Sequence, residues 1–440
     1  MRLKKWALLL FLLLLPVAQS TRKPARKRTH DELDKQTVEP TVKVPGCKWE
    51  QMRSYSDLDI PVCIKIRDKS IVQPVEIKSY AANVKHYSFF VPVNTKLVCA
   101  CPGSSFSEDQ RPTGRDIKFQ LGTNSFEAEC IDDQNMRVHD RNEDDLGAYK
   151  CERIIEFGPR KIEDPRADSF CPKPYVWKGI GFDVNLGGIE RFNLLEICYD
   201  EQKKRTIYVK HKWISGVSPG LRPPSKHWQG AKKNEEKKYS NQWHRGHLAP
   251  DADFPIYELK FLTYFYENAA PQYGPFNSVQ WLQVEKQVRN QFKEATIFTG
   301  TSDLDLNQDK ISQGMAKLNL ATTDVNEWRP DFFWKIAFGT DKESESIKMK
   351  GYIYSNKIEP KSDSFLKNKI DERFLCAYKA SVTAGYCFDG ADVEQITDLL
   401  PEAKFLWKHV DFTDTMNGLL MRRDSHPSCS KKTCLRPGSK

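Results

Sequence analysis

The hydrophobic pattern of residues 175–420 alternates between two spacings, one typical of strands and one typical of a helix. Short runs rich in β-branched and aromatic residues predict strands at 194–199, 206–210, 295–300 and 332–338. The first two runs are expected to pair. Apolar residues at helical spacing predict one helix with a buried face: Trp281, Val284, Val288 and Phe292. This mixture predicts an α+β fold with an antiparallel sheet.

A different pattern occupies residues 46–174, where short apolar runs such as 87–93 alternate with turn residues. Seven of the chain's 12 cysteines fall between Cys47 and Cys171. Dense cysteines among short strand-like runs predict a small, disulfide-rich β domain. Cys99 and Cys101 lack the second nearby pair that a zinc site needs, which favours disulfides. This segment contains no nucleophile with a base, so we expect it to be structural or to position a substrate.

The two ends of the chain differ from both predicted domains. Lys4 and Lys5, the apolar run at 6–17 and the small residues up to Ser20 are typical of a cleaved secretory signal. The run is shorter than the roughly 20 apolar residues that span a bilayer. We therefore expect a secreted, extracellular protein, with a disordered basic leader at 21–45 and a basic tail at 421–440.

An even number of cysteines in an oxidising compartment predicts disulfide bonds. Closeness in sequence makes Cys376–Cys387 and Cys429–Cys434 plausible local bridges. The polar, lysine-rich segment 226–239 is expected to be an exposed loop.

The net charge is modest for a chain of this length. There are 68 Lys and Arg residues against 59 Asp and Glu, which leaves a formal charge of +9. This balance suits a polyanion such as nucleic acid, but a plain basic secreted protein would have the same one. Charge therefore gives only a direction, and the chemistry must come from particular residues.

Those residues begin at Arg245-Gly246-His247, where a fixed cation and a titratable imidazole flank a flexible glycine. A histidine near its ordinary pKa of about 6.5 can take a proton from water at neutral pH. The alternative is that His247 has only a structural role. Further on, Asn277 precedes the predicted helix. Its amide oxygen suits Mg²⁺, which prefers oxygen ligands and keeps several waters, and a helix-capping asparagine is the alternative. Glu285 and Arg289 lie one turn apart, as in an ordinary surface ion pair.

Taken together, these motifs resemble the DNA/RNA non-specific endonucleases of the ββα-metal class, most closely the secreted arthropod branch of gut and salivary nucleases. The resemblance lies in the residues and spacing of R-G-H-L-A-P-D-A-D-F at 245–254, N-A-A-P-Q at 268–272, F-N at 276–277, Trp281, and E-x-x-x-R at 285–289. It extends to C-P-G at 101–103 and G-F-D-V at 181–184. It implies a ββα-metal nuclease domain at 175–420, preceded by the disulfide-rich β domain.

The resemblance also implies roles for six residues. They are His247 as the general base, Asn277 as the ligand of Mg²⁺ or Mn²⁺, Glu285 as the holder of metal-bound waters, Asn268 as a support, and Arg245 and Arg289 as phosphate ligands. The expected partners are double-stranded DNA and RNA. The base is expected on a β-hairpin arm and the metal-binding asparagine at the start of the following helix.

One position departs from the family pattern. Many members have Asp immediately before R-G-H, whereas this chain has His244. An anion is thereby removed from the arm, and a cation is added if His244 is protonated. Two functions therefore stay open: an active endonuclease, or a high-affinity nucleic-acid-binding protein on a nuclease scaffold with low or residual activity. A secreted interaction protein without a nucleic-acid role would require the whole set of motifs to be residual.

Overall fold

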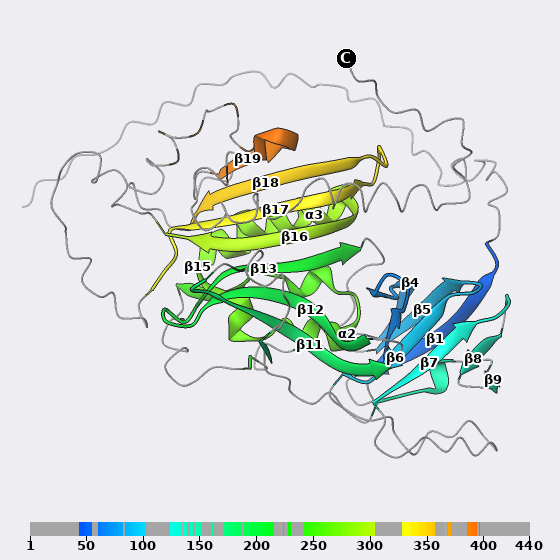
Figure 1. Cartoon of the computed structure of the whole chain (residues 1–440). Helices are drawn as coiled ribbons and strands as arrows, with labels where there is room; N and C mark the ends of the chain where they lie inside the picture. The colour runs from blue at the N-terminus through cyan, green and yellow to red at the C-terminus, as the bar shows by residue number, and fades with distance from the viewer. Residues whose placement is uncertain are drawn as a thin grey trace, which may run out of the picture. The chain divides into compact units, whose positions relative to one another are not determined.

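The computed structural model describes residues 44–396 with gaps (Figure 1). The longest gaps are 103–123, 152–159, 162–170, 215–222, 230–238, 304–327, 357–365 and 377–384. The predicted signal at 1–20, most of the leader at 21–45, and the tail at 421–440 with Cys429 and Cys434 lie outside the described residues.

The N-terminal part of the described chain consists of two small antiparallel sheets. One has the order β1 (Gly46–Ser54), β5 (Val84–Pro92) and β4 (Pro74–Ala81). The other has the order β3 (Ser70–Ile71), β2 (Val62–Lys65), β6 (Lys96–Ala100), β7 (Ser125–Cys130), β8 (Met136–Val138) and β9 (Arg141–Glu143). A single 3-10 turn, η2 (Leu146–Ala148), follows. The prediction of a β-rich front segment agrees with these strands.

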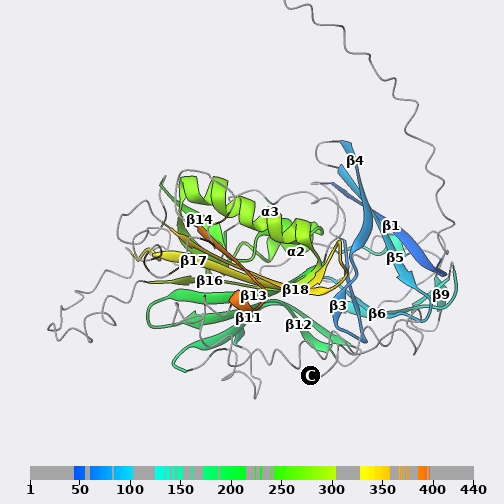
Figure 2. The same ribbon diagram turned by 90° about the horizontal axis from the view of Figure 1, so that it is seen from above.

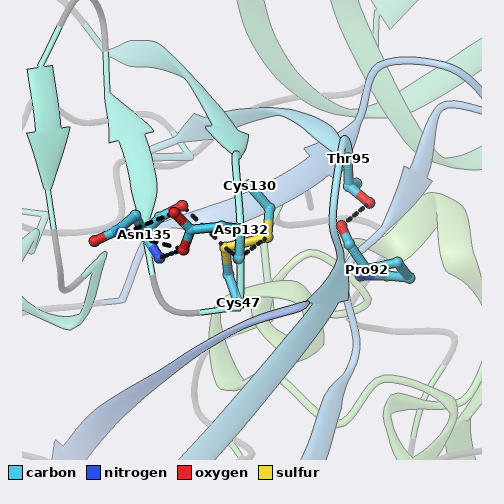
Figure 3. Close-up of a disulfide and its surroundings, with 6 residues drawn as sticks. All are labelled: Cys47, Pro92, Thr95, Cys130, Asp132 and Asn135. Carbon is cyan, nitrogen blue, oxygen red and sulfur yellow. Dashed lines mark hydrogen bonds between the residues drawn. A yellow bond between two sulfur atoms is a disulfide. The ribbon is translucent and has the colours of Figure 1, made fainter. Parts of the chain in front are cut away.

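Disulfides join the strands of this part. They link Cys47 to Cys130, Cys63 to Cys99, and Cys101 to Cys151. Figure 3 shows the first of them beside the turn after β7, where Asp132 accepts a hydrogen bond from the backbone N–H of Asn135 (2.8 Å). Cys99 and Cys101 thus belong to two separate disulfides, which confirms the preference for disulfides over a zinc site.

The C-terminal part is built on an antiparallel sheet that has eight strands among the described residues. Their order is β10 (Arg160–Lys161), β11 (Val176–Leu186), β12 (Ile189–Asp200), β13 (Arg205–Ile214), β16 (Phe292–Ser302), β17 (Phe332–Asp341), β18 (Ile347–Ser355) and β19 (Gly385–Asp389). The four strands predicted from the sequence correspond to β12, β13, β16 and β17, and β12 pairs with β13. The predicted α+β class with an antiparallel sheet is confirmed.

A separate two-stranded hairpin carries the central motif. Strand β14 (Trp243–His247) pairs antiparallel with β15 (Ala269–Tyr273), and η5 (Asp251–Asp253), α2 (Tyr257–Phe261) and η6 (Tyr266–Asn268) lie between them in sequence. The π-helical turn η7 (Phe276–Trp281) and helix α3 (Leu282–Gln291) follow. Figure 2 shows α3 and α2 on one face of the large sheet. The order strand, strand, helix is the one expected from the ββα resemblance.

The predicted helix differs from the observed one at both ends. Its first turn is π-helical, and its last apolar residue, Phe292, is extended and begins β16. Phe292 is nevertheless fully buried with Val284 and Val288 in the same core. The apolar stripe therefore predicted burial correctly, although the helix ends one residue earlier.

Strand β17 separates two hydrophobic cores because successive side chains point to opposite faces. Phe333 and Ala337 belong to the core that includes Trp281 of η7, whereas Trp334 and Ile336 belong to the core on the other face. Lys335 is two residues from both Phe333 and Ala337, so its side chain points to the same face of the sheet as theirs. A lysine is thereby buried at 1% exposure on the helix-covered face of the sheet.

Two further disulfides lie in this part of the chain. Cys376 pairs with Cys387, as predicted, and Cys171 pairs with Cys198 of β12. The second bridge crosses the predicted boundary between 174 and 175, which stays a prediction. Within the described residues, every helix is too short or too polar to span a lipid bilayer. One last 3-10 turn, η10 (Gly390–Val393), follows β19.

Candidate active site

The hairpin places the central motif at the wall of a pocket of about 910 Å³. Four of the six predicted site residues line this pocket, namely Arg245 and His247 from β14, Asn277 from η7 and Glu285 from α3. His244 lines it as well. Asn268 and Arg289 lie behind the lining. The structure therefore brings together residues that are up to 40 positions apart in sequence.

Gly246 allows the hairpin to form at its crowded centre. A Cβ atom on Gly246 would lie 2.2 Å from Oε1 and 2.6 Å from Cβ of Gln272, which is fully buried on the partner strand. Because the Cβ atom of Gln272 cannot rotate away, any larger residue at 246 must displace the strand that carries Arg245 and His247.

Replacing Gly246 with alanine is expected to lower the free energy of unfolding by about 1–3 kcal/mol, the usual cost of overpacking. The double variant Gly246→Ala, Gln272→Gly removes the clashing side chain and should recover part of the loss. Urea denaturation of the two variants and the wild type measures the difference. Equal free energies of unfolding for Gly246→Ala and the wild type would show that β15 can move aside without loss of stability.

Two aromatic rings pack against His247. The ring centroids of Trp228 and Tyr264 lie 4.7 and 4.8 Å from the imidazole centroid. The Tyr264 hydroxyl donates a hydrogen bond to the Asp251 carboxylate (2.8 Å), which fixes the tyrosine in place. The centroids of Trp228 and Tyr264 lie 5.2 Å from each other, so the imidazole and the two rings form one compact aromatic cluster in the pocket wall.

Arg245 lies against a second pair of rings. Its Nε donates to the hydroxyl of Tyr266 (3.1 Å), and its guanidinium lies 5.5 Å from the ring centroid of Tyr239 and 5.6 Å from that of Tyr266. Cation–π contacts of this kind restrict the side chain without neutralising its charge. The positive charge of Arg245 thus lines the pocket in a defined orientation.

The prediction of an exposed loop at 226–239 is wrong for the residues of this segment that the structure describes. Gln229 is buried, because its backbone N–H donates to Tyr264 O (2.8 Å) and its carbonyl accepts from Tyr266 N (3.1 Å). These bonds attach the segment to the chain beside η6. As a result, Trp228 and Tyr239 form part of the pocket wall.

Asn268 holds the turn that follows His247. Its amide nitrogen donates to the carbonyls of Ala249 (2.9 Å) and Thr263 (2.8 Å), and its amide oxygen accepts from the N–H of Ala249 (2.9 Å). Its own carbonyl accepts from the N–H of Leu248 (2.9 Å). These bonds fix the backbone directly after His247.

A buried carboxylate ties three elements together behind the pocket. Asp253 of η5 accepts hydrogen bonds from Nε2 of His211 on β13 (2.8 Å) and from a guanidinium nitrogen of Arg289 on α3 (2.7 Å). Burial alone would raise the pKa of Asp253, but His211 and Arg289 together hold it below its ordinary value. Burial also lowers the pKa of His211, which favours a neutral imidazole.

Glu285 extends this network to the pocket. A guanidinium nitrogen of Arg289 lies 3.9 Å from its carboxylate. Burial raises the pKa of Glu285 above its ordinary value, and the charges of Lys335 and Arg289 oppose this shift. Lys335 contacts the hydroxyl of Thr299, and its ammonium lies 5.4 Å from the ring centroid of Trp281. Two cations thereby sit beneath the carboxylate that faces the pocket.

The side chains of Asn277 and His244 lie next to each other in the pocket lining. The amide nitrogen of Asn277 lies 3.3 Å from Nδ1 of His244. Among the described residues, no three His, Cys, Asp or Glu side chains gather into a metal-binding cluster. The donors in the pocket lining include Asn277, its neighbour His244, Glu285 and Asp251, and water would supply the remaining ligands of a metal ion. Oxygen donors with water as the remaining ligands fit a divalent cation such as Mg²⁺.

Sequence reasoning missed His211, Asp253 and Lys335 as members of this site. Asp253 lies inside the motif at 245–254, but its partners are 42 and 36 positions away. Lys335 carried a visible signal, because it is a single charge within the otherwise apolar run at 332–338. A charge at a buried strand position requires a partner, and here the carboxylate of Glu285 provides it.

Comparison with known proteins gives the following similarities. Residues 179–384 match the sequence profile of the DNA/RNA non-specific endonucleases. The chain is 26% identical over 219 residues to a salivary endonuclease of Culex quinquefasciatus, covering 42% of this chain and 57% of that protein. It is 26% identical over 279 residues to a salivary endonuclease of Lutzomyia longipalpis, covering 55% of this chain and 64% of that protein. The matched regions thus span less than two thirds of either relative.

Among solved structures, a chain from the crystal structure of the EndoG/EndoGI complex matches with a TM-score of 0.28 and 16% sequence identity. The match covers 37% of this chain and 72% of that one.

Proposed function

We propose that this chain, which carries a domain of the DNA/RNA non-specific endonuclease family at residues 179–384, is a secreted, metal-dependent enzyme that hydrolyses the phosphodiester bonds of DNA and RNA with little sequence specificity. The observation that supports this most is the convergence of His247, Arg245, Asn277 and Glu285 on one pocket. The family acts on nucleic acids, and both matched relatives are salivary endonucleases.

His247 is the proposed general base. It takes a proton from a water molecule, and the water oxygen then attacks phosphorus in line with the leaving oxygen. Trp228 and Tyr264 pack against the imidazole and against each other, and Asn268 fixes the backbone that follows His247. Such fixing supports proton transfer because a general base must stay within hydrogen-bond reach of its water.

Nucleases of this family are generally metal-dependent, and Mg²⁺ or Mn²⁺ would stabilise the charge that develops on the phosphate and the leaving oxygen. Asn277 is the proposed protein ligand. Glu285 is proposed to hold metal-bound water. Burial raises the pKa of Glu285, and the charges of Lys335 and Arg289 beneath it offset part of this rise and so favour the ionised form. A carboxylate that accepts hydrogen bonds from water must be ionised to accept on both oxygens.

The two arginines take different parts in this proposal. Arg245 lines the pocket and binds the phosphate next to the scissile bond. Arg289 was predicted to do the same, but its bond to Asp253 and its position behind the lining support a positioning role for it. Both charges favour a polyanionic substrate, and we propose double-stranded DNA and RNA as the partners.

The deciding experiment is incubation of the purified protein with plasmid DNA and with long double-stranded RNA, in magnesium and in chelator, beside a gel-shift on the same substrates. Magnesium-dependent degradation of both supports the proposal. Binding should weaken steeply as salt rises, because counterions are released from phosphate contacts. Degradation that survives chelation would contradict the metal-dependent mechanism.

A second function is favoured by His244. Its imidazole faces Asn277 at 3.3 Å, where the family pattern has an acid, and this changes the donors around the proposed metal. The alternative is a secreted protein that binds nucleic acid with high affinity but cleaves it slowly. Tight, salt-sensitive gel shifts with little cutting would support this alternative.

Replacing Asn277 with alanine is expected to raise the Mg²⁺ concentration needed for half-maximal cleavage by roughly 10- to 100-fold and to lower the rate, since the proposed ligand is lost. Asn277→Asp keeps an oxygen donor and should retain more affinity. Ser278→Ala changes the next pocket residue and serves as the control. A Mg²⁺ titration of cleavage that is unchanged in Asn277→Ala would refute the ligand assignment.

A further inference from the structure

We propose that His244 is itself a metal ligand and that, with Asn277, it shifts the metal preference of this pocket from Mg²⁺ toward Mn²⁺ and other cations that accept nitrogen donors. This inference rests on one part of the proposed function, namely that the pocket binds a metal ion. It concerns which side chains hold the metal and which metal they favour.

The first support is the distance between the two side chains. Nδ1 of His244 lies 3.3 Å from the terminal nitrogen of the Asn277 amide. Half a turn of the amide exchanges its nitrogen and oxygen and places the oxygen at the same position. Two ligand atoms that bind one cation at about 2.1 Å, at octahedral or tetrahedral angles, are about 3.0–3.4 Å apart. The pair therefore has the separation of two neighbouring ligands of one cation.

The second support is the orientation of the imidazole. A Cβ atom on Gly274 would lie 2.8 Å from Nε2 and 3.1 Å from Cε1 of His244. The edge of the ring that carries Nε2 therefore lies close to the backbone of Gly274, and only a glycine leaves room for it. The other ring nitrogen, Nδ1, is the one that faces Asn277. The hairpin thus selects which nitrogen is presented to a metal.

The third support is the arrangement of the other donors, since the carboxylates of the pocket lining, Asp251 and Glu285, do not gather with His244 into a cluster. The described residues contain no cluster of three His, Cys, Asp or Glu side chains that could hold a metal ion. A single imidazole then has a large share in the binding energy and in the selectivity. Mg²⁺ prefers oxygen and gives up water reluctantly, whereas imidazole suits first-row transition metals, among which Mn²⁺ still accepts many oxygen ligands.

The test measures metal binding by the full secreted protein without nucleic acid. Isothermal titration should give a dissociation constant for Mn²⁺ at least about tenfold below that for Mg²⁺. His244→Ala should weaken Mn²⁺ binding by roughly 10- to 100-fold, the range seen when groups around a metal are removed. His244→Asp should narrow the difference between the two metals, because it replaces nitrogen by oxygen.

A spectroscopic measurement distinguishes a ligand from a structural residue. Electron spin echo experiments on bound Mn²⁺ should show coupling to a histidine nitrogen in the wild type and none in His244→Ala or His244→Asp. The control is His86→Ala, which removes a half-buried histidine that is paired with Glu50 in the N-terminal part. His86→Ala should leave the coupling and both affinities unchanged.

The outcomes separate this inference from the proposed function. The assignment of His244 as a metal ligand would be overturned by nitrogen coupling that persists in both His244 variants. It would also be overturned if the wild type and both variants had the same preference for Mn²⁺ over Mg²⁺. His244 would then be only a hydrogen-bonding neighbour of Asn277. Circular dichroism and thermal unfolding of each variant identify any that do not fold, and His244→Asp then carries the test alone. Absence of cleavage would count against the nuclease proposal, but not against a His244-dependent metal site.

Discussion

Replacing His247 with alanine is expected to slow phosphodiester cleavage by about 100- to 10,000-fold, which is the usual contribution of a positioned general base. The imidazole lines the pocket and packs against Trp228 and Tyr264, and the described pocket lining contains one other histidine, His244. Binding of nucleic acid should change little, because the proposed phosphate contact is made by Arg245.

Single-turnover cleavage with the variant in excess over plasmid DNA measures this effect without interference from product release. A gel-shift on the same DNA, in chelator, measures binding. His244→Ala is the informative comparison within the pocket, since it removes the neighbouring imidazole and should impair metal binding instead. Cleavage by His247→Ala at the wild-type rate would remove His247 from the mechanism and would transfer the role of base to another group.

The second large effect is expected at Asp253, where alanine should lower the free energy of unfolding by about 3–5 kcal/mol at pH 7. Removing one partner of a buried ion pair costs this much because it leaves the other charge buried without compensation. Here the guanidinium of Arg289 loses its closest carboxylate, and His211 loses its hydrogen-bond acceptor. The side chain of Asp253 is only 3% exposed, so water cannot replace it.

Urea denaturation of Asp253→Ala and the wild type measures this difference. Glu129→Ala is the matched control, because it also removes a carboxylate from an arginine, Arg137, but at the surface. A surface pair contributes at most about 1 kcal/mol. The pKa of Asp253 is lowered in the folded state. Its contribution is therefore complete above the unfolded pKa of about 3.9 and is lost as the pH falls below it. A loss below about 1 kcal/mol at pH 7 would contradict the assigned network.

Much of the sheet could be predicted from the sequence, because its central strands are long, apolar and rich in aromatic residues. Strands β16 and β17 were expected at nearly their observed positions for this reason. The burial of Gln229 could not be predicted, since the composition of the segment at 226–239 is polar and this burial accompanies backbone bonds of Gln229 to a distant part of the chain. Composition cannot reveal a bridge of that kind.

The pocket residues that belong to short sequence motifs could be predicted. Arg245 and His247 are two residues apart in β14, and Asn277 and Glu285 are eight residues apart in the continuous helical stretch of η7 and α3. The support beneath them was not predictable, because it depends on which residues the sheet brings opposite one another. Lys335 lies opposite Thr299 only through the register of β16 and β17, and Asp253 meets His211 only when η5 lies over β13.

The long sequence separations within this support have a consequence for the order in which the pocket is completed. Ribosomal synthesis delivers His211, Asp253, Arg289 and Lys335 in that order, and contacts between distant residues form late in folding. The ammonium beneath Glu285 arrives last, with β17. A nascent chain that has not yet reached this strand lacks the cation that offsets the charge of Glu285, so the pocket cannot be complete before β17 has been synthesised.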